Sequence, residues 1–296
     1  MPPAHAPAVD VLERCACDGY EQLRIQYAGD EDDMIAAFLL IPPAQGPRPA
    51  VLIHHQHNGE RHWGKSEVCG LAGNPLQAFG PALARRGFVV LAPDSIAFED
   101  RRAGRQGTQP APDPEEDWLQ HFNQMAYRLL RGDTLMRKVL SDALRGTAVL
   151  AGDPRVDARR VGLLGHSYGG NTVLFQAAVD DRVAFACSSG AAASFRQKFA
   201  AGTGIEMAEV IPGFAQRWDI DDLIGAASPR RMLIVSAAED KYSQDAADIV
   251  HRARTACVAD GVPDHLEHQP YPGGHALTSD RFEGIVRWMD RMSRER

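Results

Sequence analysis

Short apolar runs separated by polar, proline-rich or glycine-rich turns recur along the whole chain, and longer amphipathic segments lie between many of them. The short runs have the composition of buried strands, and the longer segments have the apolar spacing of helices. The predicted strands are 22–27, 34–41, 50–54, 88–92, 161–164, 183–189, 231–236 and 265–271. The predicted helices are 75–86, bent at Gly80-Pro81, and 117–130, 134–150, 171–179, 244–259 and 279–292. This alternation predicts an α/β protein with a mostly parallel central sheet flanked by helices.

Two long segments interrupt the alternation. Residues 95–132 are polar and rich in proline over much of their length, and a compact domain seldom carries so long a loop without a use for it. We expect an insertion over the mouth of a site, with a solvated surface excursion as the alternative. Residues 190–227 contain enough apolar surface to line an acyl or sugar pocket, or to form a surface helix pair packed on the core. The aromatic residues of this second segment are Phe195, Phe199, Phe214 and Trp218.

Length and composition set the frame for these elements. The 296 residues are 44% hydrophobic, which is ample for a sizeable core, and we expect one domain over residues 1–296. The net charge of −7, without a basic stripe, argues against nucleic acid or an anionic membrane as partner. No secretory signal pattern opens the chain and no apolar run reaches the length of a membrane span, so we expect a cytoplasmic location. The five cysteines lack zinc-type pairing, and we interpret them as reduced, structural thiols.

The stretch VGLLGHSYGGN, from Val161 to Asn171, carries the strongest chemical signal in the chain. A compact apolar strand runs directly into Gly165-His166-Ser167-Tyr168-Gly169, and a helix-compatible segment follows. This is the strand, sharp turn and helix of a nucleophile elbow, in which a strained turn needs small neighbours two positions on either side of the serine. Ser167 is therefore the predicted nucleophile, with an ordinary glycine-rich turn as the alternative.

At this motif the chain resembles the α/β-hydrolase superfamily. Residues 132–170 are similar to the approach to the nucleophile in dienelactone hydrolase-like and acetyl xylan esterase-like proteins. The resemblance implies an α/β-hydrolase fold with insertions over the active site, and a catalytic acid and histidine that follow the serine in that order. It implies no cofactor.

Candidates for both later members of such a triad occur after predicted strands. Asp240 lies in the loop after 231–236, where the resemblance places the acid; Glu239, Asp245 and Asp248 are weaker alternatives. His275 lies in a glycine-softened loop after 265–271. The other histidines beyond Ser167 fall within a predicted helix or strand, so His275 is the predicted base.

The loop after strand 50–54, within VLIHHQHNG, occupies the position that supplies an oxyanion-hole N–H in this fold. The resemblance places that donor at His57, with Gln56 as the alternative, and the second donor at the backbone N–H of Tyr168. The histidines of this region also raise the alternative of a metal site. Their side chains leave the chain in different directions, however, so we expect no metal here. These histidines are His54, His55, His57 and His62.

Together these features predict a serine hydrolase that cleaves a small-molecule or carbohydrate carboxylic ester through an acyl-enzyme intermediate. Dienelactone hydrolases resembling this chain use cysteine at the elbow, so the serine favours ordinary ester chemistry over an enol-lactone substrate. The alternatives are a peptidase of the prolyl oligopeptidase-like branch, a lactone hydrolase, and a catalytically silent binding protein.

Overall fold

One mixed sheet of nine strands organises the computed structural model, which describes residues 6–43 and 45–295. The strand order is β1-β2-β3-β5-β4-β6-β7-β8-β9. The strands β1 to β3 and β5 pair antiparallel in that order, and the pairs from β5 across to β9 are all parallel. The strands are β1 (Val9–Cys17), β2 (Tyr20–Ala28), β3 (Met34–Ile41), β4 (Arg48–His54), β5 (Val89–Pro93), β6 (Val156–His166), β7 (Phe185–Ser189), β8 (Arg231–Ala237) and β9 (Leu266–Tyr271).

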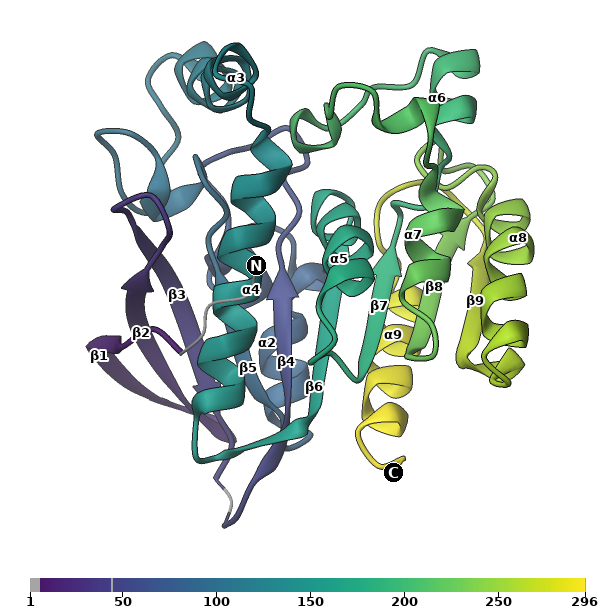
Figure 1. Cartoon of the computed structure of the whole chain (residues 1–296). Helices are drawn as coiled ribbons and strands as arrows, with labels where there is room; N and C mark the ends of the chain where they lie inside the picture. The colour runs from purple at the N-terminus through teal and green to yellow at the C-terminus, as the bar shows by residue number, and fades with distance from the viewer. Residues whose placement is uncertain (1–5, 44, 296) are drawn as a thin grey trace.

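Helices cover both faces of this sheet (Figure 1). The α-helices are α1 (Lys65–Val68), α2 (Phe79–Ala84), α3 (Pro114–Leu130), α4 (Leu135–Gly152), α5 (Tyr168–Val179), α6 (Phe195–Ala201), α7 (Ile220–Ala226), α8 (Ala246–Ala259) and α9 (Ser279–Met292). Short 3-10 helices are η1 (Pro75–Gln77), η2 (Glu99–Arg101), η3 (Met207–Glu209), η4 (Phe214–Gln216) and η5 (Pro263–His265).

Side-chain alternation along the strands divides the core into two layers. In β4, Ala50 and Leu52 belong to the core beneath α4, α5, α7 and α8, whereas Val51 and Ile53 belong to the core beneath α1, α2 and α9. All four side chains are fully buried. Because both faces of the parallel strands are covered, these strands read as continuous apolar runs rather than alternating ones. The expected α/β-hydrolase architecture, with a mostly parallel sheet between two helical layers, is confirmed.

Most element positions agree with the prediction, and two differ. The strand β1 was not predicted; it lies at the edge of the sheet, and its residues are largely exposed, so it lacks the apolar pattern of a buried strand. The bend predicted at Gly80-Pro81 is wrong, because the chain breaks at Ala78, between η1 and α2. Gly80 and Pro81 lie in the first turn of α2. A backbone N–H in the first turn has no intrahelical acceptor, so a proline there costs the helix no hydrogen bond.

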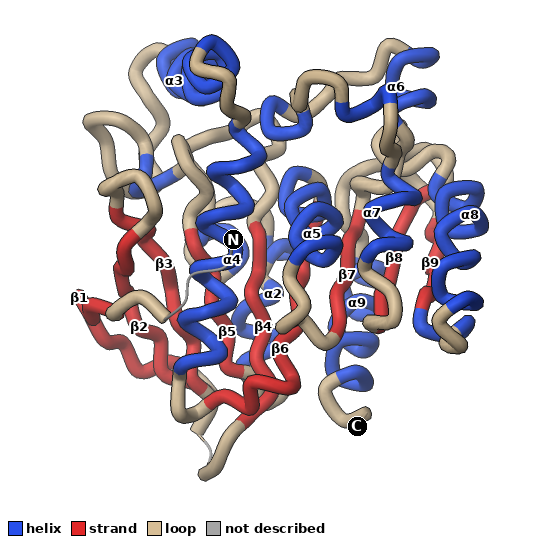
Figure 2. Tube along the Cα trace, in the orientation of Figure 1, coloured by secondary structure: helices blue, strands red, loops and turns tan. Residues whose placement is uncertain are grey.

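Both long inserted segments lie beyond the carboxyl ends of the parallel strands, with α3 and α6 at the top of the molecule (Figure 2). A third apolar cluster joins them to the body of the fold and includes Phe98, Tyr168, Phe175 and Ala208. Of the aromatic residues predicted in 190–227, Phe214 packs against both Phe175 and Phe195. Phe199 and Trp218 are exposed.

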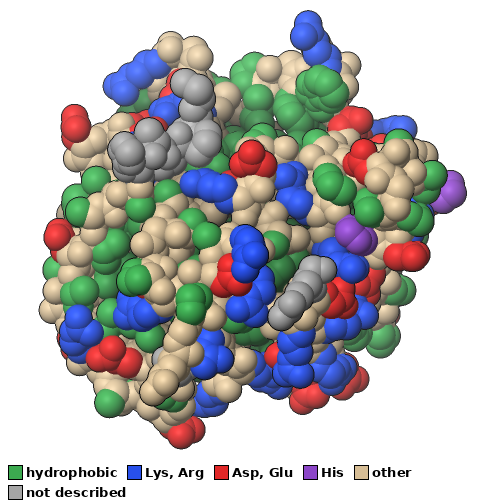
Figure 3. Space-filling model, turned by 60° about the horizontal axis from the view of Figure 1, so that its bottom comes forward, with side chains coloured by type: hydrophobic (Ala, Val, Ile, Leu, Met, Phe, Trp, Pro, Cys, Tyr) green, Lys and Arg blue, Asp and Glu red, His purple; other side chains and the backbone are tan. Residues whose placement is uncertain are grey.

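The opposite end of the sheet carries charges of both signs (Figure 3). A shallow surface cavity there is lined by Asp157, Arg159, Arg160, Arg294 and Glu295, among others. Asp157 accepts hydrogen bonds from both Arg159 and Arg160. Within the described residues, no helix combines the length and the hydropathy needed to cross a bilayer.

The cysteines all lie within the described part of the chain, and none is paired in a disulfide. Cys69, Cys187 and Cys257 are buried, the first two in the core beneath α2 and α9 and the third in the core beneath α7 and α8. Cys15 is exposed on β1 and Cys17 is half-buried at its end. The free thiols agree with the interpretation from the sequence.

Candidate active site

Ser167 occupies a strained turn between β6 and α5. Its backbone φ is +57° and its ψ is −123°, a conformation that residues with a side chain rarely adopt. A Cβ at Gly165 would lie 2.2 Å from the carbonyl oxygen of Gly169, and one at Gly169 would lie 2.1 Å from the carbonyl oxygen of His54. Both flanking glycines are therefore required by close backbone approach, as the elbow motif predicts.

The turn places Ser167 next to His275. The Oγ of Ser167 lies 2.8 Å from Nε2 of His275, and Nδ1 of His275 lies 3.0 Å from Oδ1 of Asp240. These three residues are far apart in sequence. They come from the segments that follow β6, β8 and β9, and these strands, together with β7, are neighbours in the parallel part of the sheet. Parallel strands end at the same edge, so their following loops converge. The geometry is that of a nucleophile, a base and an orienting acid.

Asp240 is buried but kept ionised. Burial would raise the pKa of its carboxyl, but hydrogen bonds from His275, the backbone N–H of Tyr242 and the hydroxyl of Ser243 outweigh burial, and the pKa falls below its usual value. Among the alternative acids, Asp245 accepts hydrogen bonds from Ser194 instead. Within the described residues, Asp240 alone of the four candidates hydrogen-bonds to His275, and a carboxylate there can orient the imidazole.

Two residues that the sequence did not single out support His275. The ring of His166 stacks on that of His275, with centroids 5.0 Å apart and planes 30° from parallel. Burial, followed by the nearby His275, lowers the pKa of His166 well below the usual value, so this ring is neutral. Arg281 is fully buried, and its Nη1 donates to the backbone carbonyls of residues 274, 275 and 276 at 2.9, 3.4 and 3.2 Å.

One hydroxyl group links His166 to Arg281. The Oγ of Ser189, at the end of β7, lies 3.0 Å from Nδ1 of His166 and accepts from Nη2 of Arg281 at 3.4 Å. His166 lies inside the elbow pentapeptide, but nothing in the sequence around Arg281 distinguishes it from the other arginines of α9. The histidine loop is therefore held from beneath by contacts that only the folded chain creates.

The loop after β4 lies against the elbow and is held by its own side chains. Nδ1 of His55 lies 2.7 Å from the carbonyl oxygen of Gln56, and Nε2 of His55 accepts from the backbone N–H of Ser95 at 3.0 Å. The side chain of Gln56 turns inward and donates to both oxygens of the buried Glu67 at 3.1 Å. Tyr168 is the first residue of α5, where a backbone N–H has no intrahelical acceptor.

The four histidines of this region bind four different partners. His54 contacts Gln176, His57 contacts Glu206, and His62 contacts Glu60, while His55 bonds to the backbone. Burial lowers the pKa of His54 to about 4 and that of His55 to about 3, so both are neutral at pH 7. Each of the four side chains therefore has a polar partner of its own.

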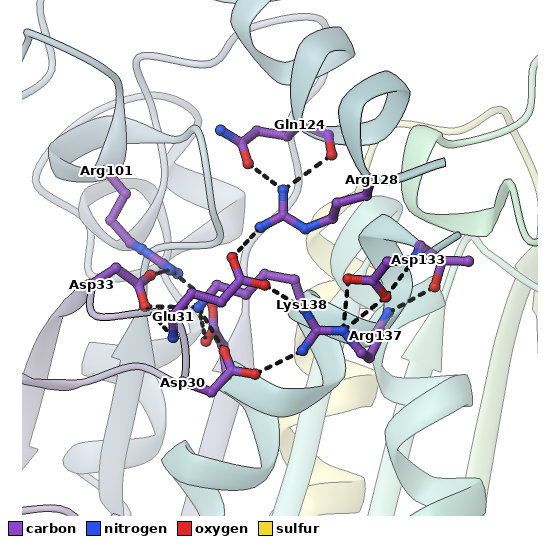
Figure 4. Close-up of polar contacts among 11 residues, drawn as sticks. Asp30, Glu31, Asp33, Arg101, Gln124, Arg128, Asp133, Arg137 and Lys138 are labelled. Carbon is purple, nitrogen blue, oxygen red and sulfur yellow. Dashed lines mark hydrogen bonds and ion pairs between the residues drawn. The ribbon is translucent and has the colours of Figure 1, made fainter. Parts of the chain in front are cut away.

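Two acidic trios in the described part of the chain have the spacing to hold a cation, and a lysine lies in each. One consists of Asp30, Asp33 and Asp142, and Nζ of Lys138 lies 2.8 to 2.9 Å from all three (Figure 4). The other consists of Asp94, Glu99 and Asp100, and Nζ of Lys65 contacts all three at 2.5 to 2.8 Å. An ammonium group thus supplies the positive charge in both places.

A narrow pocket adjoins Ser167 beneath the second inserted segment. Its polar lining includes Asn171, Lys198, Glu206, Glu209 and Tyr242, and its glycines include Gly190 and Gly204. Neither of the exposed aromatics, Phe199 and Trp218, lines it. None of the four aromatic residues of 190–227 lines this pocket: Phe195 and Phe214 pack inward against each other, and Phe199 and Trp218 face solvent.

Solved structures that resemble this one are esterases by name. A structure from Bacteroides fragilis described as an acetyl xylan esterase has a TM-score of 0.73 at 15% identity and covers 97% of this chain and 83% of its own. A glucuronoyl esterase from Solibacter usitatus has a TM-score of 0.69 at 16% identity, over 100% of this chain and 88% of its own. At this identity the similarity concerns the fold, and it confirms the α/β-hydrolase architecture.

Sequence comparison gives the family. YtaP of Bacillus subtilis, which is named as a hydrolase, is 31% identical over 149 residues. That match covers 50% of this chain and 45% of YtaP, so it spans about half of either protein. The model of the dienelactone hydrolase family matches residues 35–195, from β3 through the elbow to the start of α6. Since the matched residues make up more than half of this chain, the chain belongs to the dienelactone hydrolase family.

Proposed function

We propose that this protein is a serine hydrolase that cleaves carboxylic esters through an acyl-enzyme intermediate. The observation that carries the proposal is the continuous hydrogen-bond chain from Ser167 through His275 to Asp240. A serine hydroxyl is a weak nucleophile by itself and reacts when an adjacent base removes its proton. His275 lies within hydrogen-bonding distance of that proton, and family membership supports hydrolysis as the reaction class.

In the first half of the reaction, Nε2 of His275 takes the proton from Ser167 as Oγ attacks the ester carbonyl carbon. The imidazolium that forms is stabilised by the ionised carboxylate of Asp240, which also keeps Nδ1 protonated. His275 then donates its proton to the departing alkoxide oxygen. The alcohol leaves, and the acyl group remains on Ser167 as an ester.

The negative charge on the carbonyl oxygen needs donors that are in place before the reaction. We assign them to the backbone N–H groups of Tyr168 and His57, with Gln56 as the alternative to His57. Three contacts support this assignment by restraining the loop: His55 to Gln56, His57 to Glu206, and Gln56 to Glu67. A restrained loop loses little further freedom when it binds the oxyanion, so its donors stabilise the transition state more.

In the second half, His275 activates a water molecule that attacks the acyl carbon, and the proton then returns to Ser167 as the acid leaves. No step requires a metal or an organic cofactor. A serine oxygen at the elbow favours ordinary esters of small molecules or carbohydrates as substrates.

The test is the variant Ser167→Ala, assayed with p-nitrophenyl acetate and labelled with a fluorophosphonate probe. We expect turnover to fall by at least about 10⁴-fold and labelling to be lost, because the nucleophile is removed. Thermal unfolding and circular dichroism should remain close to those of the wild type. Ser279→Ala, at an exposed position of α9, is the matched control and should retain both activity and labelling. Retained turnover in Ser167→Ala would refute the assignment.

A further inference from the structure

The pocket beside Ser167 contains one polar side chain whose hydrogen-bonding capacity is unused. Asn171 is only 7% exposed, and its Oδ1 is buried without a hydrogen-bond partner in the structure. Its side-chain nitrogen donates no hydrogen bond to any of the described residues either. A buried amide normally bonds at both ends, because leaving either end unpaired is unfavourable. Asn171 therefore has a donor and an acceptor available to a group that enters the pocket.

The charged side chains of the pocket are already paired. Nζ of Lys198 lies 2.7 and 2.8 Å from the two carboxylate oxygens of Glu209, and this ion pair is almost completely buried. The carboxylate of Glu206 lies 2.9 Å from Nε2 of His57. Burial would raise the pKa of Glu206, but the contact with His57 and the nearby charges of Arg61 and Lys198 together outweigh it, and the pKa is lowered, so the carboxylate is ionised. These residues shape the pocket, and Asn171 is the buried lining residue whose side chain has an unsatisfied acceptor.

The charge of the lining favours a neutral group over an anion. Two carboxylates, Glu206 and Glu209, face one ammonium, that of Lys198. An anionic substrate group would have to approach this excess of negative charge at low local dielectric, which is unfavourable. A hydroxyl suits the site better, because it can donate to Oδ1 of Asn171 and accept from its nitrogen at the same time.

The position of Asn171 limits how far this hydroxyl lies from the reacting bond. Asn171 follows Ser167 by one helical turn, and its backbone N–H donates to the carbonyl oxygen of Ser167 at 3.0 Å. The side chains of both residues line the same narrow pocket. A group that bonds to Asn171 while Ser167 attacks the carbonyl carbon therefore belongs to a part of the substrate that is only a few bonds away from that carbon.

On this basis we propose that the pocket is a subsite for a neutral hydroxyl group close to the scissile ester, with Asn171 as the residue that selects it. The inference rests on the proposed esterase function and adds a substrate class: esters whose acyl or alcohol part carries a hydroxyl on the carbon next to the ester linkage or one bond further. A hydroxy acid ester and a partly acylated polyol or sugar share this chemistry.

Matched pairs of esters test the proposal and distinguish the two sources of the hydroxyl. Methyl lactate against methyl propionate varies the acyl part, and 2-hydroxyethyl acetate against ethyl acetate varies the alcohol. For the wild type we expect kcat/KM to favour the hydroxylated member of at least one pair by about tenfold, the effect of one or two net hydrogen bonds. Monomethyl succinate, which carries a carboxylate, should be a poorer substrate than methyl propionate.

The variant Asn171→Ala should bring the ratio within the preferred pair close to one, and Asn171→Asp should lower it as well, since the amide donor is replaced by another anion. Gln216→Ala, at an exposed position of the same inserted segment, is the control and should keep the wild-type ratio. Fluorophosphonate labelling shows that each variant retains a folded, reactive Ser167.

A wild-type ratio near one in both pairs, or an unchanged ratio in Asn171→Ala, would overturn the subsite. A failure of the proposed function looks different: no ester of either pair is cleaved and Ser167 is not labelled. Preference for the carboxylate ester would also overturn the proposal, because it would show that the pocket attracts an anion.

Discussion

Arg281 is completely buried, and its Nη1 lies 2.9 Å from the backbone carbonyl oxygen of Gly274, one residue before His275. The same nitrogen also reaches the carbonyls of residues 275 and 276. A glycine-containing loop gains a fixed shape when one guanidinium bonds to three successive carbonyl groups. Arg281 is thus a positioning residue: it acts on the proposed reaction through the placement of the His275 ring.

Replacing Arg281 by methionine should lower kcat by about 10- to 100-fold and leave KM within a few-fold, because a small misplacement of the base affects the chemical step more than binding. Steady-state kinetics with p-nitrophenyl acetate measure kcat and KM separately. Arg281→Lys, which restores part of the donor capacity, should recover part of kcat. The matched control is Arg287→Met on the exposed face of α9, for which wild-type kinetics are expected. Equal loss of kcat in both methionine variants would contradict the positioning role.

Asp240→Asn should reduce kcat by about 10⁴-fold with little change in the fold, because an amide in this position no longer stabilises the imidazolium and favours the wrong tautomer of His275. Activity assays and thermal unfolding together measure both effects. Asp248→Asn provides the control, since Asp248 was an alternative acid and is exposed on α8. If Asp248→Asn were the inactive variant instead, the assignment of the acid would be wrong.

Gly169→Ala should destabilise the protein by about 3 kcal/mol, the upper part of the range for inserting a methyl group into closely packed structure. The added Cβ would lie 2.1 Å from the carbonyl oxygen of His54, and a backbone atom cannot move aside without distorting the end of β4. Urea unfolding followed by circular dichroism measures the change. Gly204→Ala is the control, because a Cβ there meets open space. Similar stability of the two variants would contradict the close approach.

Lys138→Met should destabilise the fold by about 3 kcal/mol, because Asp30, Asp33 and Asp142 would lose the cation that they share. These contacts join the turn between β2 and β3 to α4 (Figure 4). Arg137→Met is the control: this side chain is 46% exposed, and its loss should cost less than about 1 kcal/mol. Chemical unfolding of both variants at pH 7 measures how much unfolding free energy each one loses, and equal losses would contradict the prediction.

The contribution of Lys138 should depend on pH in the acid range. Burial would raise the pKa of Asp30, but hydrogen bonds from Lys138, Ser141 and Arg137 together with the charge of Lys138 outweigh it, and the pKa falls to about 2. Because the folded pKa is below the unfolded value of about 4, this stabilisation is present above pH 4 and is lost as the pH falls toward 2. The difference in unfolding free energy between wild type and Lys138→Met should therefore shrink below pH 4. A difference that stays constant from pH 5 to pH 3 would contradict this linkage.

Much of the fold follows from local patterns. The predicted ranges 34–41 and 279–292 coincide with β3 and α9, because a buried parallel or central strand and a capped amphipathic helix both have strong local patterns. The exposed edge strand β1 has no such pattern, since pairing with β2 rather than burial holds it in the sheet. The break at Ala78 was misplaced because proline in a first helical turn and proline at a kink look alike in sequence.

The candidate site likewise has one part that local sequence predicts and another that depends on tertiary contacts. The residues around Ser167 could be predicted because the strain of the elbow demands glycines at fixed positions, and chain order then narrows the acid and base to Asp240 and His275. Which side chains surround them depends on contacts between segments far apart in the chain. Arg281 beneath the histidine loop, His166 against its ring and Asn171 in the pocket carry no local signal, because burial, orientation and hydrogen-bond partners are set by tertiary packing and not by neighbours in sequence.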